Sequence, residues 1–406
     1  MNSLTKLFCE TEYFGDSIRY TEDAHAQRHG TTAGHGPVVV WNITRTCNLH
    51  CIHCYSDSDS VHYAGELTTD EAMAFLQDLA GFHVPALLIS GGEPLMRRDF
   101  FDLLAEAQRL GLRVTISTNG TLITPDVAKK FRQYGVSYVG ISLDGIGEVN
   151  DYFRGQPGAF ERALRGIRNC VDAGQRAGLR FTLNRHNYES LPGILDVIEK
   201  EHIDRACFYH LAYSGRGRGI MGDDLGPAET RAALDLLIRR TIDWHERGMT
   251  KEILTVDNHA DPIYAYLWAK KHMPERAPRI LELVRRNGGN RSGIAIADVD
   301  FTGNVHPDQF SMNHTVGNIR AKPFSEIWRS DVPLLADLRR RKELLHGRCA
   351  TCQWLPVCNG NLRVRAEAAT GDYWASDPAC YLTDEEIASS PLAQQQPAAG
   401  AGVAGE

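Results

Sequence analysis

Short apolar runs alternate with longer amphipathic stretches between residues 37 and 215. The short runs are rich in valine, isoleucine and aromatic residues, which favour strands, and the stretches between them repeat their apolar positions at helical spacing. The predicted strands cover residues 38–44, 86–92, 113–120, 137–144, 179–184 and 205–212. Because strands that alternate with helices pair in parallel through right-handed crossovers, the pattern predicts an α/β fold, either a doubly wound sheet or a full or partial barrel.

Polar residues gather at the ends of several of these predicted strands. They form the runs SGGEP (90–94), STNG (117–120), SLDG (142–145) and LNRHN (183–187). Both α/β architectures place their binding sites at the carboxyl ends of parallel strands. We therefore expect a functional site at this edge of the sheet.

The alternation of strands and helices ends at a segment rich in glycine and charged residues, 214–227. Two long helical stretches follow, and the pattern over 294–308 predicts a β-hairpin that turns at residues 302–304. The expected parts are an N-terminal extension (1–36), a barrel-like α/β domain (37–215), a helical connection (216–290), a C-terminal domain with a β-hairpin and helices (291–387) and a disordered, low-complexity tail (388–406).

The composition narrows the class of protein. Of the 406 residues, 43% are apolar and 23% are charged, and no run approaches the roughly 20 apolar residues of a membrane span. The N-terminus lacks an apolar stretch of signal-peptide length, so we expect a cytoplasmic protein with no membrane partner. A formal net charge of -7 gives no general attraction to nucleic acid, so small molecules or proteins are the expected partners.

Seven of the ten cysteines fall into two clusters. Disulfides are rare in a reducing compartment, so the clusters indicate metal binding. The first cluster, Cys47, Cys51 and Cys54, directly follows a predicted strand. Cubane iron–sulfur clusters normally take four thiolates, so three cysteines leave one iron open for a ligand. A structural zinc loop is the competing interpretation.

The CxxxCxxC spacing and the SGGEP run at the end of the next strand together resemble the radical S-adenosylmethionine (radical SAM) superfamily. The resemblance implies a partial (β/α)6 TIM-type barrel and an enzyme whose catalytic Cys47, Cys51 and Cys54 hold a 4Fe-4S cluster. SAM would bind the open iron through its amino and carboxylate groups. Reduction would release a 5′-deoxyadenosyl radical that abstracts hydrogen from the substrate.

The same resemblance assigns SAM-binding roles to residues that follow the predicted strands. These residues are Gly91, Gly92, Glu93, Ser117, Asn119, Ser142, Arg154 and Asn184. The first three would bind the methionine amino group and the next two the ribose or the carboxylate, while the last three are weaker matches. A turn or helix-cap role is the competing interpretation for the serine and asparagine residues. The family usually has an aromatic residue before the third cysteine, whereas this chain has His53, which puts adenine stacking from that position in doubt.

The second cluster has four cysteines: Cys349, Cys352, Cys358 and Cys380. Four thiolates close a metal site, and from the residues alone either a second iron–sulfur cluster or a tetrahedral zinc is open. The placement resembles the auxiliary-cluster domains called SPASM or twitch, in the shorter form with one cluster. A second 4Fe-4S cluster in such a domain could give or take an electron.

A closer resemblance covers residues 37–387 and is to the radical SAM proteins of heme d1 biosynthesis. It rests on runs such as VGISLDGIGEVNDYFRG, GNVHPDQF, GNIRAKPFSEIW and NLRVRAEAATGDYWASDPACYLTDEEI. It implies that the substrate is didecarboxysiroheme, an iron tetrapyrrole, and that two propionate side chains are removed. It also implies a setting of anaerobic denitrification and a low-potential electron donor such as flavodoxin or ferredoxin.

An anionic, iron-bearing substrate suggests further candidate residues. Arginine forks bind carboxylates and histidine can bind iron axially. The candidates are Arg154, Arg185, Arg216 and Arg218 for carboxylates, and His210 and His306 for iron. An ordinary solvated or hydrogen-bonded side chain is the competing interpretation for each of them.

Three alternative functions stay open from the sequence. Two are other radical SAM reactions, a heme-forming decarboxylase and a peptide maturase. The third is a non-catalytic iron–sulfur or zinc protein that carries electrons or binds a partner, which the SGGEP run beside an open three-cysteine site disfavours.

Overall fold

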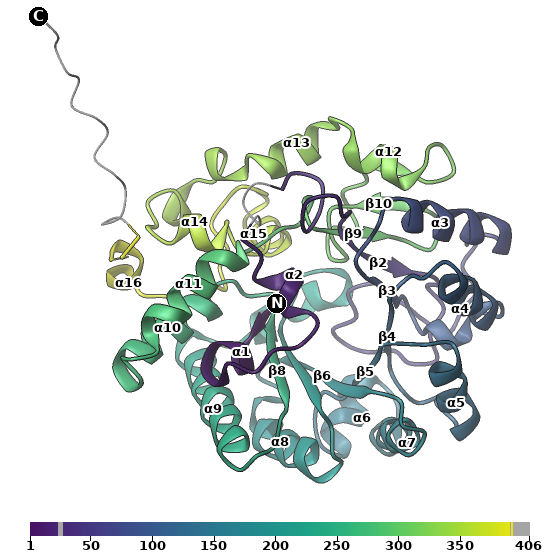
Figure 1. Ribbon diagram of the computed structural model, residues 1–406, viewed down its shortest axis with the longest axis horizontal. Coiled ribbons are helices and arrows are strands. Elements are labelled where there is room, and N and C mark those ends of the chain that lie inside the picture. The colour runs from purple at the N-terminus through teal and green to yellow at the C-terminus, as the bar shows by residue number, and fades with distance from the viewer. Residues whose placement is uncertain (23–26, 390, 393–406) are drawn as a thin grey trace, which may run out of the picture.

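The computed structural model describes residues 1–22, 27–389 and 391–392. Across these residues, eleven strands form one sheet in the order β1-β8-β7-β6-β5-β4-β3-β2-β9-β10-β11. Helices form a ring around the strands (Figure 1). Most of the predicted tail, 388–406, lies outside the described residues.

The predicted strands are all present and pair in parallel in sequence order. They are β2 (Val38–Asn42), β3 (Leu87–Ser90), β4 (Val114–Thr118), β5 (Tyr138–Ser142), β6 (Ala177–Leu183) and β7 (Arg205–His210). The helices between them are α3 (Thr69–Gly81), α4 (Phe100–Arg109), α5 (Pro125–Gln133), α6 (Glu148–Arg154), α7 (Ala159–Asp172) and α8 (Leu191–Lys200). This arrangement confirms the α/β class and the partial barrel.

The sheet continues beyond the predicted strands at the β7 edge. Beyond β7, β8 (Glu252–Val256) adds a parallel strand, and β1 (Asn2–Ser3) pairs antiparallel with it. The sequence patterns indicate only helices over 216–290, where the structure has β8 between α9 (Pro227–Glu246) and α10 (Asp261–His272), followed by α11 (Ala277–Asn287). All five residues of β8 are buried, so its pattern has no alternation to mark it as a strand.

The C-terminal domain joins the sheet at its other edge. Its predicted hairpin is β9 (Ile296–Val299) and β10 (Asn304–His306), and β9 lies parallel to β2. Its other elements are β11 (Gly317–Asn318), α12 (Phe324–Arg329), α13 (Pro333–Arg339), α14 (Leu355–Cys358), α15 (Arg363–Thr370) and α16 (Asp384–Ala388). Because β9 pairs directly with β2, this domain is held against the strand that leads into the first cysteine loop.

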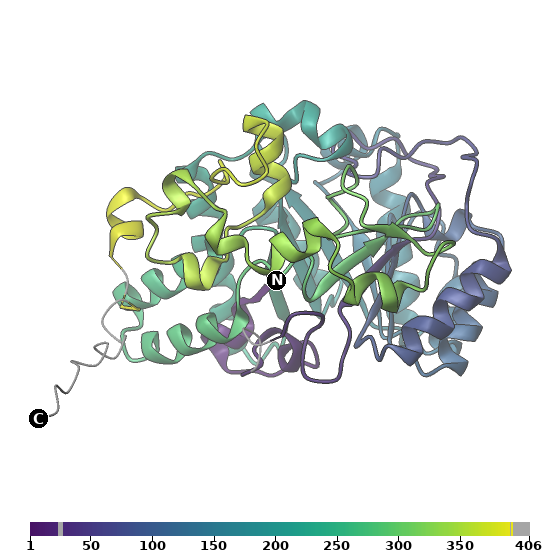
Figure 2. The same ribbon diagram turned by 90° about the horizontal axis from the view of Figure 1, so that it is seen from above.

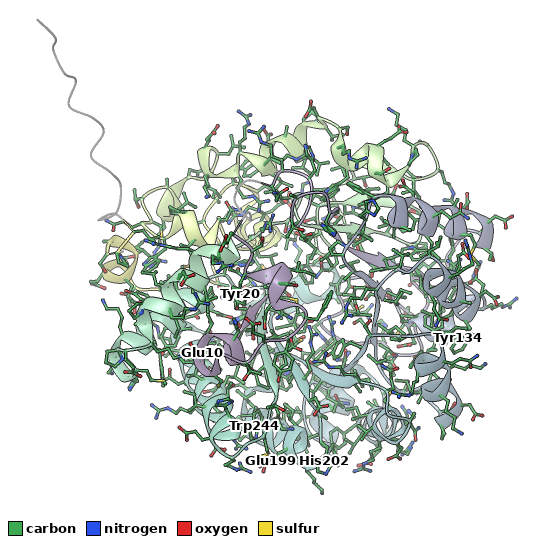
Figure 3. All side chains as sticks on the ribbon, viewed as in Figure 1. Glu10, Tyr20, Tyr134, Glu199, His202 and Trp244 are labelled. Carbon is green, nitrogen blue, oxygen red and sulfur yellow. The ribbon has the colours of Figure 1, made fainter. Side chains whose placement is uncertain are left out.

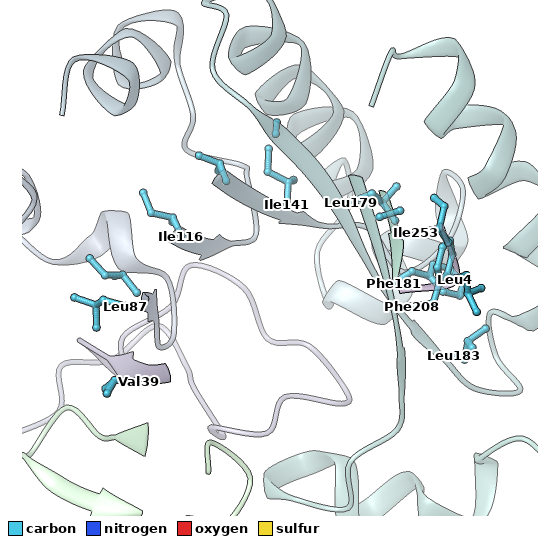
Figure 4. Packing of buried hydrophobic residues seen from close by; sticks show 14 of the residues in the cluster. Leu4, Val39, Leu87, Ile116, Ile141, Leu179, Phe181, Leu183, Phe208 and Ile253 are labelled. Atoms are coloured by element: carbon cyan, nitrogen blue, oxygen red, sulfur yellow. The ribbon is translucent and has the colours of Figure 1, made fainter. Parts of the chain in front are cut away.

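The hydrophobic core lies between the sheet and the surrounding helices. Strand residues such as Val39, Leu87, Ile116 and Ile141 belong to it, as Figure 4 shows. Successive strand residues point to opposite faces, so the residues between them point into the barrel. The sheet therefore has an apolar outer face and an inner face free to carry polar groups.

The N-terminal segment closes the end of the barrel at which the parallel strands begin. It contains α1 (Leu4–Cys9) and α2 (Asp16–Arg19). The Tyr20 side chain, labelled in Figure 3, follows α2, and its hydroxyl accepts a hydrogen bond from the Ser3 amide at 2.8 Å. Arg19 pairs at 2.9 Å with Glu252 at the start of β8. In Figure 2 this purple segment lies along the lower edge of the molecule, away from the loop that follows β2. The carboxyl ends of the strands are thereby left as the place for a site.

Candidate functional site

The three cysteines of the first cluster line one cavity at the carboxyl ends of the barrel strands. Cys47 and Cys51 are buried, and Cys54 is half-buried. The backbone amides of Leu49 and Ser58 donate to the sulfurs of Cys47 (3.4 Å) and Cys54 (3.5 Å). Burial raises the pKa of the Cys47 thiol to about 12, so a thiolate there requires a cationic partner. The iron of an iron–sulfur cluster supplies such a partner. The three cysteine thiolates therefore fit an iron–sulfur cluster as its ligand set.

Gly91 and Gly92 pack backbone against backbone on the segment between β2 and Cys47. A Cβ at Gly91 would lie 2.3 Å from the Thr44 carbonyl oxygen, and one at Gly92 would lie 2.3 Å from that of Thr46. The Gly92 amide donates to Thr44 O at 2.8 Å. Both glycines also line the cavity, as a role in SAM binding requires. Their first physical effect, however, is to fix the path of the chain into Cys47.

Glu93 is fully buried, and its carboxylate is held by the end of β4. It accepts hydrogen bonds from the Thr118 hydroxyl at 2.8 Å and from the Asn119 amide at 2.8 Å. Burial raises the pKa of Glu93 to about 7. Its carboxylate therefore joins the ends of β3 and β4, beside the cavity residues Thr118 and Asn119.

The polar residues at the next two strand ends do reach the cavity. Ser117, Asn119 and Ser142 all line it. The Asn119 side-chain amide donates to Asn48 Oδ1 at 2.8 Å and points toward the Cys47 sulfur at 3.9 Å. The cysteine loop is thus tied directly to the end of β4.

Arg154 connects the middle cysteine to the end of β5. Its guanidinium pairs with the buried Asp144 carboxylate and donates to the Cys51 sulfur at 3.6 Å. His53 lies 3.5 Å from the same carboxylate and packs against the Phe153 ring, with 4.5 Å between centroids. Burial lowers the pKa of His53 to about 4, so the ring is neutral near pH 7. A neutral, packed ring at this position forms part of the cavity wall.

Several other candidate residues lie outside this cavity. Asn184 is fully buried, and its side chain bonds Thr182 O and the His186 amide within the turn after β6. Arg185 is exposed and pairs with Glu229. His306 bonds Asp300 and the His314 carbonyl inside the hairpin region.

The other candidates lie near the cysteine loop. Arg216 donates to the Cys51 carbonyl at 2.7 Å and to Asp57 at 2.9 Å, which braces the loop. His210 lines the cavity, and its ring bonds the Asp261 carboxylate at 3.0 Å. Arg218 lines a neighbouring cavity.

The barrel interior adds cavity residues that the sequence analysis does not identify. They include Arg180 of β6, Tyr209 of β7 and Asp257 after β8. Asp257 has a left-handed backbone (φ 68°), and its Oδ2 is buried without a hydrogen-bond partner among the described residues. Burial raises the pKa of Asp257 to about 6. A carboxyl group that spends part of its time protonated near neutral pH therefore faces the cavity.

A second cavity, of about 570 Å³, adjoins the first at Tyr55. It lies between the cysteine loop, the segment after β7 and the C-terminal domain, and its walls include Arg45, Phe301 and Met312. Tyr55 is fixed between the two cavities because its hydroxyl bonds Asn42 (2.9 Å) and Ser90 (3.0 Å). Tyr55 directly follows the cysteine motif. This position is the only feature of the sequence that indicates a role for Tyr55 at the site.

The four cysteines of the second cluster surround one small cavity with largely apolar walls. Burial raises the pKa of the Cys380 thiol to about 11, and Arg348 donates to its sulfur at 3.5 Å. Within the described ranges, no three His, Cys, Asp or Glu side chains converge on a point suited to a single metal ion. In a zinc site, all four cysteine sulfurs would lie about 2.3 Å from one ion. In a cubane cluster, each sulfur binds a different iron, so the four sulfurs lie farther apart. The donor set fits a cluster with four thiolates.

No helix within the described residues is long and apolar enough to cross a membrane.

Two family models match the sequence. One is described as the radical SAM superfamily and covers residues 41–198, and the other is an iron-sulfur cluster-binding domain, SPASM, over residues 294–353. These domains imply a 4Fe-4S cluster with SAM and an auxiliary iron–sulfur cluster, as the two cysteine sets lead one to expect.

Curated relatives cover almost the whole chain. The sequence is 50% identical over 395 residues to Fe-coproporphyrin III synthase of Methanosarcina barkeri, which is 95% of this chain and 99% of the relative. It is 46% identical over 356 residues to pre-heme d1 synthase of Dinoroseobacter shibae, which is 87% of this chain and 88% of the relative. An AdoMet-dependent heme synthase of Methanosarcina barkeri is 35% identical over 84% of this chain and 95% of its own.

Solved structures share the fold at low identity. Streptococcus suis SuiB bound to S-adenosylmethionine is 18% identical with a TM-score of 0.68, over 86% of this chain and 78% of that one. The structure described as native anSMEcpe with bound AdoMet is 17% identical with a TM-score of 0.65, over 84% of this chain and 93% of that one. These likenesses concern the arrangement of the barrel and its C-terminal domain.

Proposed function

Because the chain belongs to the radical SAM superfamily, among its heme-related synthases, we propose that it removes two propionate side chains from didecarboxysiroheme. The observation that carries this proposal is the three-cysteine cavity beside a second cavity of about 570 Å³. The first brings together the three cysteines that would hold a cluster and the glycine, serine and asparagine residues that would bind SAM. The second offers room for a macrocycle next to them.

The residues of the chain have separate tasks in this reaction. When bound, the cluster and SAM supply a 5′-deoxyadenosyl radical that abstracts hydrogen from a propionate carbon. Arg154 and Asn119 orient the cysteine sulfurs, and the neutral His53 ring helps to exclude water from the cavity. A low-potential donor such as flavodoxin or ferredoxin would deliver the reducing electron.

The walls of the second cavity combine apolar and charged side chains. Phe301 and Met312 offer apolar surface for the faces of a macrocycle, and Arg218 offers a cation for a carboxylate, whereas Arg45 pairs with Asp57 at 3.0 Å. Asp300 and Glu367 also line this cavity, and they pair with His306 and His314 respectively.

The proposal is tested by incubating the reconstituted protein anaerobically with didecarboxysiroheme, SAM and a reductant. We expect 5′-deoxyadenosine to form and the pigment mass to fall by the loss of propionate chains. If SAM is cleaved while the pigment mass stays constant, didecarboxysiroheme is not the substrate.

A second candidate follows from the 50% identity to Fe-coproporphyrin III synthase, which exceeds the 46% identity to pre-heme d1 synthase. The same incubation separates the two reactions. Comigration of the product with authentic Fe-coproporphyrin III would favour the second candidate. A product that has lost propionate chains would favour the first.

The auxiliary cluster gives a separate prediction. Cys380→Ala should reduce the iron content from about eight to about four atoms per chain, because one of two cubanes loses a ligand. Iron and acid-labile sulfide measurements check this result. The control is Cys170→Ala, which alters a fully buried free thiol outside both clusters and should leave the iron content unchanged. An unchanged iron content in Cys380→Ala would remove Cys380 from the ligand set.

A further inference from the structure

Arg180 places a guanidinium inside the barrel, in the cavity lined by the three cysteines. We infer that Arg180 binds a carboxylate of the tetrapyrrole substrate and so positions the side chain that reacts. This inference rests on the proposed function. It adds a residue of a strand interior to the loop arginines already considered for the acid groups of the substrate.

The inward direction of Arg180 follows from the strand pattern of β6. Leu179 and Phe181 are fully buried in the core outside the sheet, so Arg180 between them points to the barrel interior. Thr182, two residues later, lines the same cavity. The position is therefore set by the sheet itself, which holds a side chain more rigidly than a loop does.

The neighbouring strands leave a place for this side chain. On β5, a Cβ at Gly140 would lie only 2.8 Å from the Arg180 Cδ, so a larger residue there would displace the arginine. On β7, the Tyr209 ring lies under the guanidinium, 4.6 Å from its centre. The glycine provides space and the tyrosine provides a flat surface, which together orient the planar fork.

The charge of Arg180 is left without an acidic partner. Among the described residues, no carboxylate oxygen lies within 4.0 Å of its guanidinium nitrogens, the distance at which an ion pair forms. The other arginine in this cavity, Arg154, is paired with Asp144. Asp257 lines the same cavity and is near enough for the Arg180 charge to oppose the rise in its pKa, but the two side chains make no ion pair. The half-buried Arg180 guanidinium therefore gains most from an anionic ligand that can take two parallel hydrogen bonds.

The test measures binding without turnover. Didecarboxysiroheme and its methyl esters are titrated into the reconstituted, SAM-loaded protein in the absence of reductant, for wild type, Arg180→Gln and Arg180→Lys. Arg180→Gln should weaken binding of the free acid about tenfold or more, since a charge-assisted hydrogen bond is lost. Arg180→Lys should recover part of this affinity, because it keeps the charge without the fork. The esters should bind wild type and Arg180→Gln with similar affinity.

Controls separate this inference from the proposed function and from misfolding. Arg168→Gln removes an exposed arginine on α7 that pairs with Glu201, and it should bind the free acid like wild type. Iron content and far-UV circular dichroism verify that the Arg180 variants are folded. Wild-type protein that binds no iron tetrapyrrole would refute the proposed function and this inference together. If wild type binds the acid but Arg180→Gln binds it equally well, or loses SAM instead, the inference alone is wrong.

Discussion

Gly92→Ala is expected to reduce reductive SAM cleavage by about 100-fold or more. The added Cβ would lie 2.3 Å from Thr46 O and 2.6 Å from Arg45 O, which are backbone atoms of the segment that enters the cysteine motif. Backbone cannot move aside as a flexible side chain can, so the segment and Cys47 must shift. A displacement of about 1 Å in a catalytic site typically costs about 100-fold in rate. Formation of 5′-deoxyadenosine after dithionite reduction measures the effect.

A glycine elsewhere in the barrel serves as the matched control for this substitution. Gly81 ends α3, and a Cβ there would meet nothing within 4 Å. Gly81→Ala should leave SAM cleavage unchanged and the helix slightly more stable. If Gly92→Ala cleaves SAM at the wild-type rate, the tight backbone contact does not position the cysteine loop.

The barrel could be predicted from the sequence because apolar residues repeat at different spacings in its strands and its helices. The runs at 86–92 and 113–120, for example, became β3 and β4 with polar residues directly after them. β8 could not be predicted in this way. Its five residues are all buried, so it has no alternation, and it becomes recognisable as a strand only once β7 is beside it.

The candidate site was predictable where spacing along the chain carries the chemistry. Cys47, Cys51 and Cys54 do line one cavity. Arg180 and Asp257 were not predictable, because their meeting depends on strand direction and on closure of the barrel. The role of Glu93 in SAM binding stays a prediction, and the structure adds that its carboxylate accepts a hydrogen bond from the Thr118 hydroxyl.

A buried ion pair joins the barrel to the auxiliary cysteine cluster. The side chains of Arg365 and Asp377 are both 0% exposed, with 2.9 Å between Nη2 and Oδ2. Arg365 also donates to Asp257 O at 2.6 Å, at the end of β8. Asp377 accepts from the Ala379 amide at 2.9 Å, directly before Cys380. The pair therefore connects the barrel edge with the loop that carries the last cysteine.

Arg365→Gln is expected to lower the free energy of unfolding by about 3–5 kcal/mol, because it leaves the Asp377 carboxylate buried without its counter-ion. Urea unfolding followed by circular dichroism under anaerobic conditions measures this loss. The control is Arg340→Gln, which breaks the exposed pair with Asp337 and should leave the unfolding midpoint unchanged. In the double variant Arg365→Gln/Asp377→Asn, no lone charge stays buried, so its loss should be smaller than the sum of the two single losses. Strict additivity would mean that the two side chains stabilise the C-terminal domain independently, and the pair would then not be the link between it and the barrel.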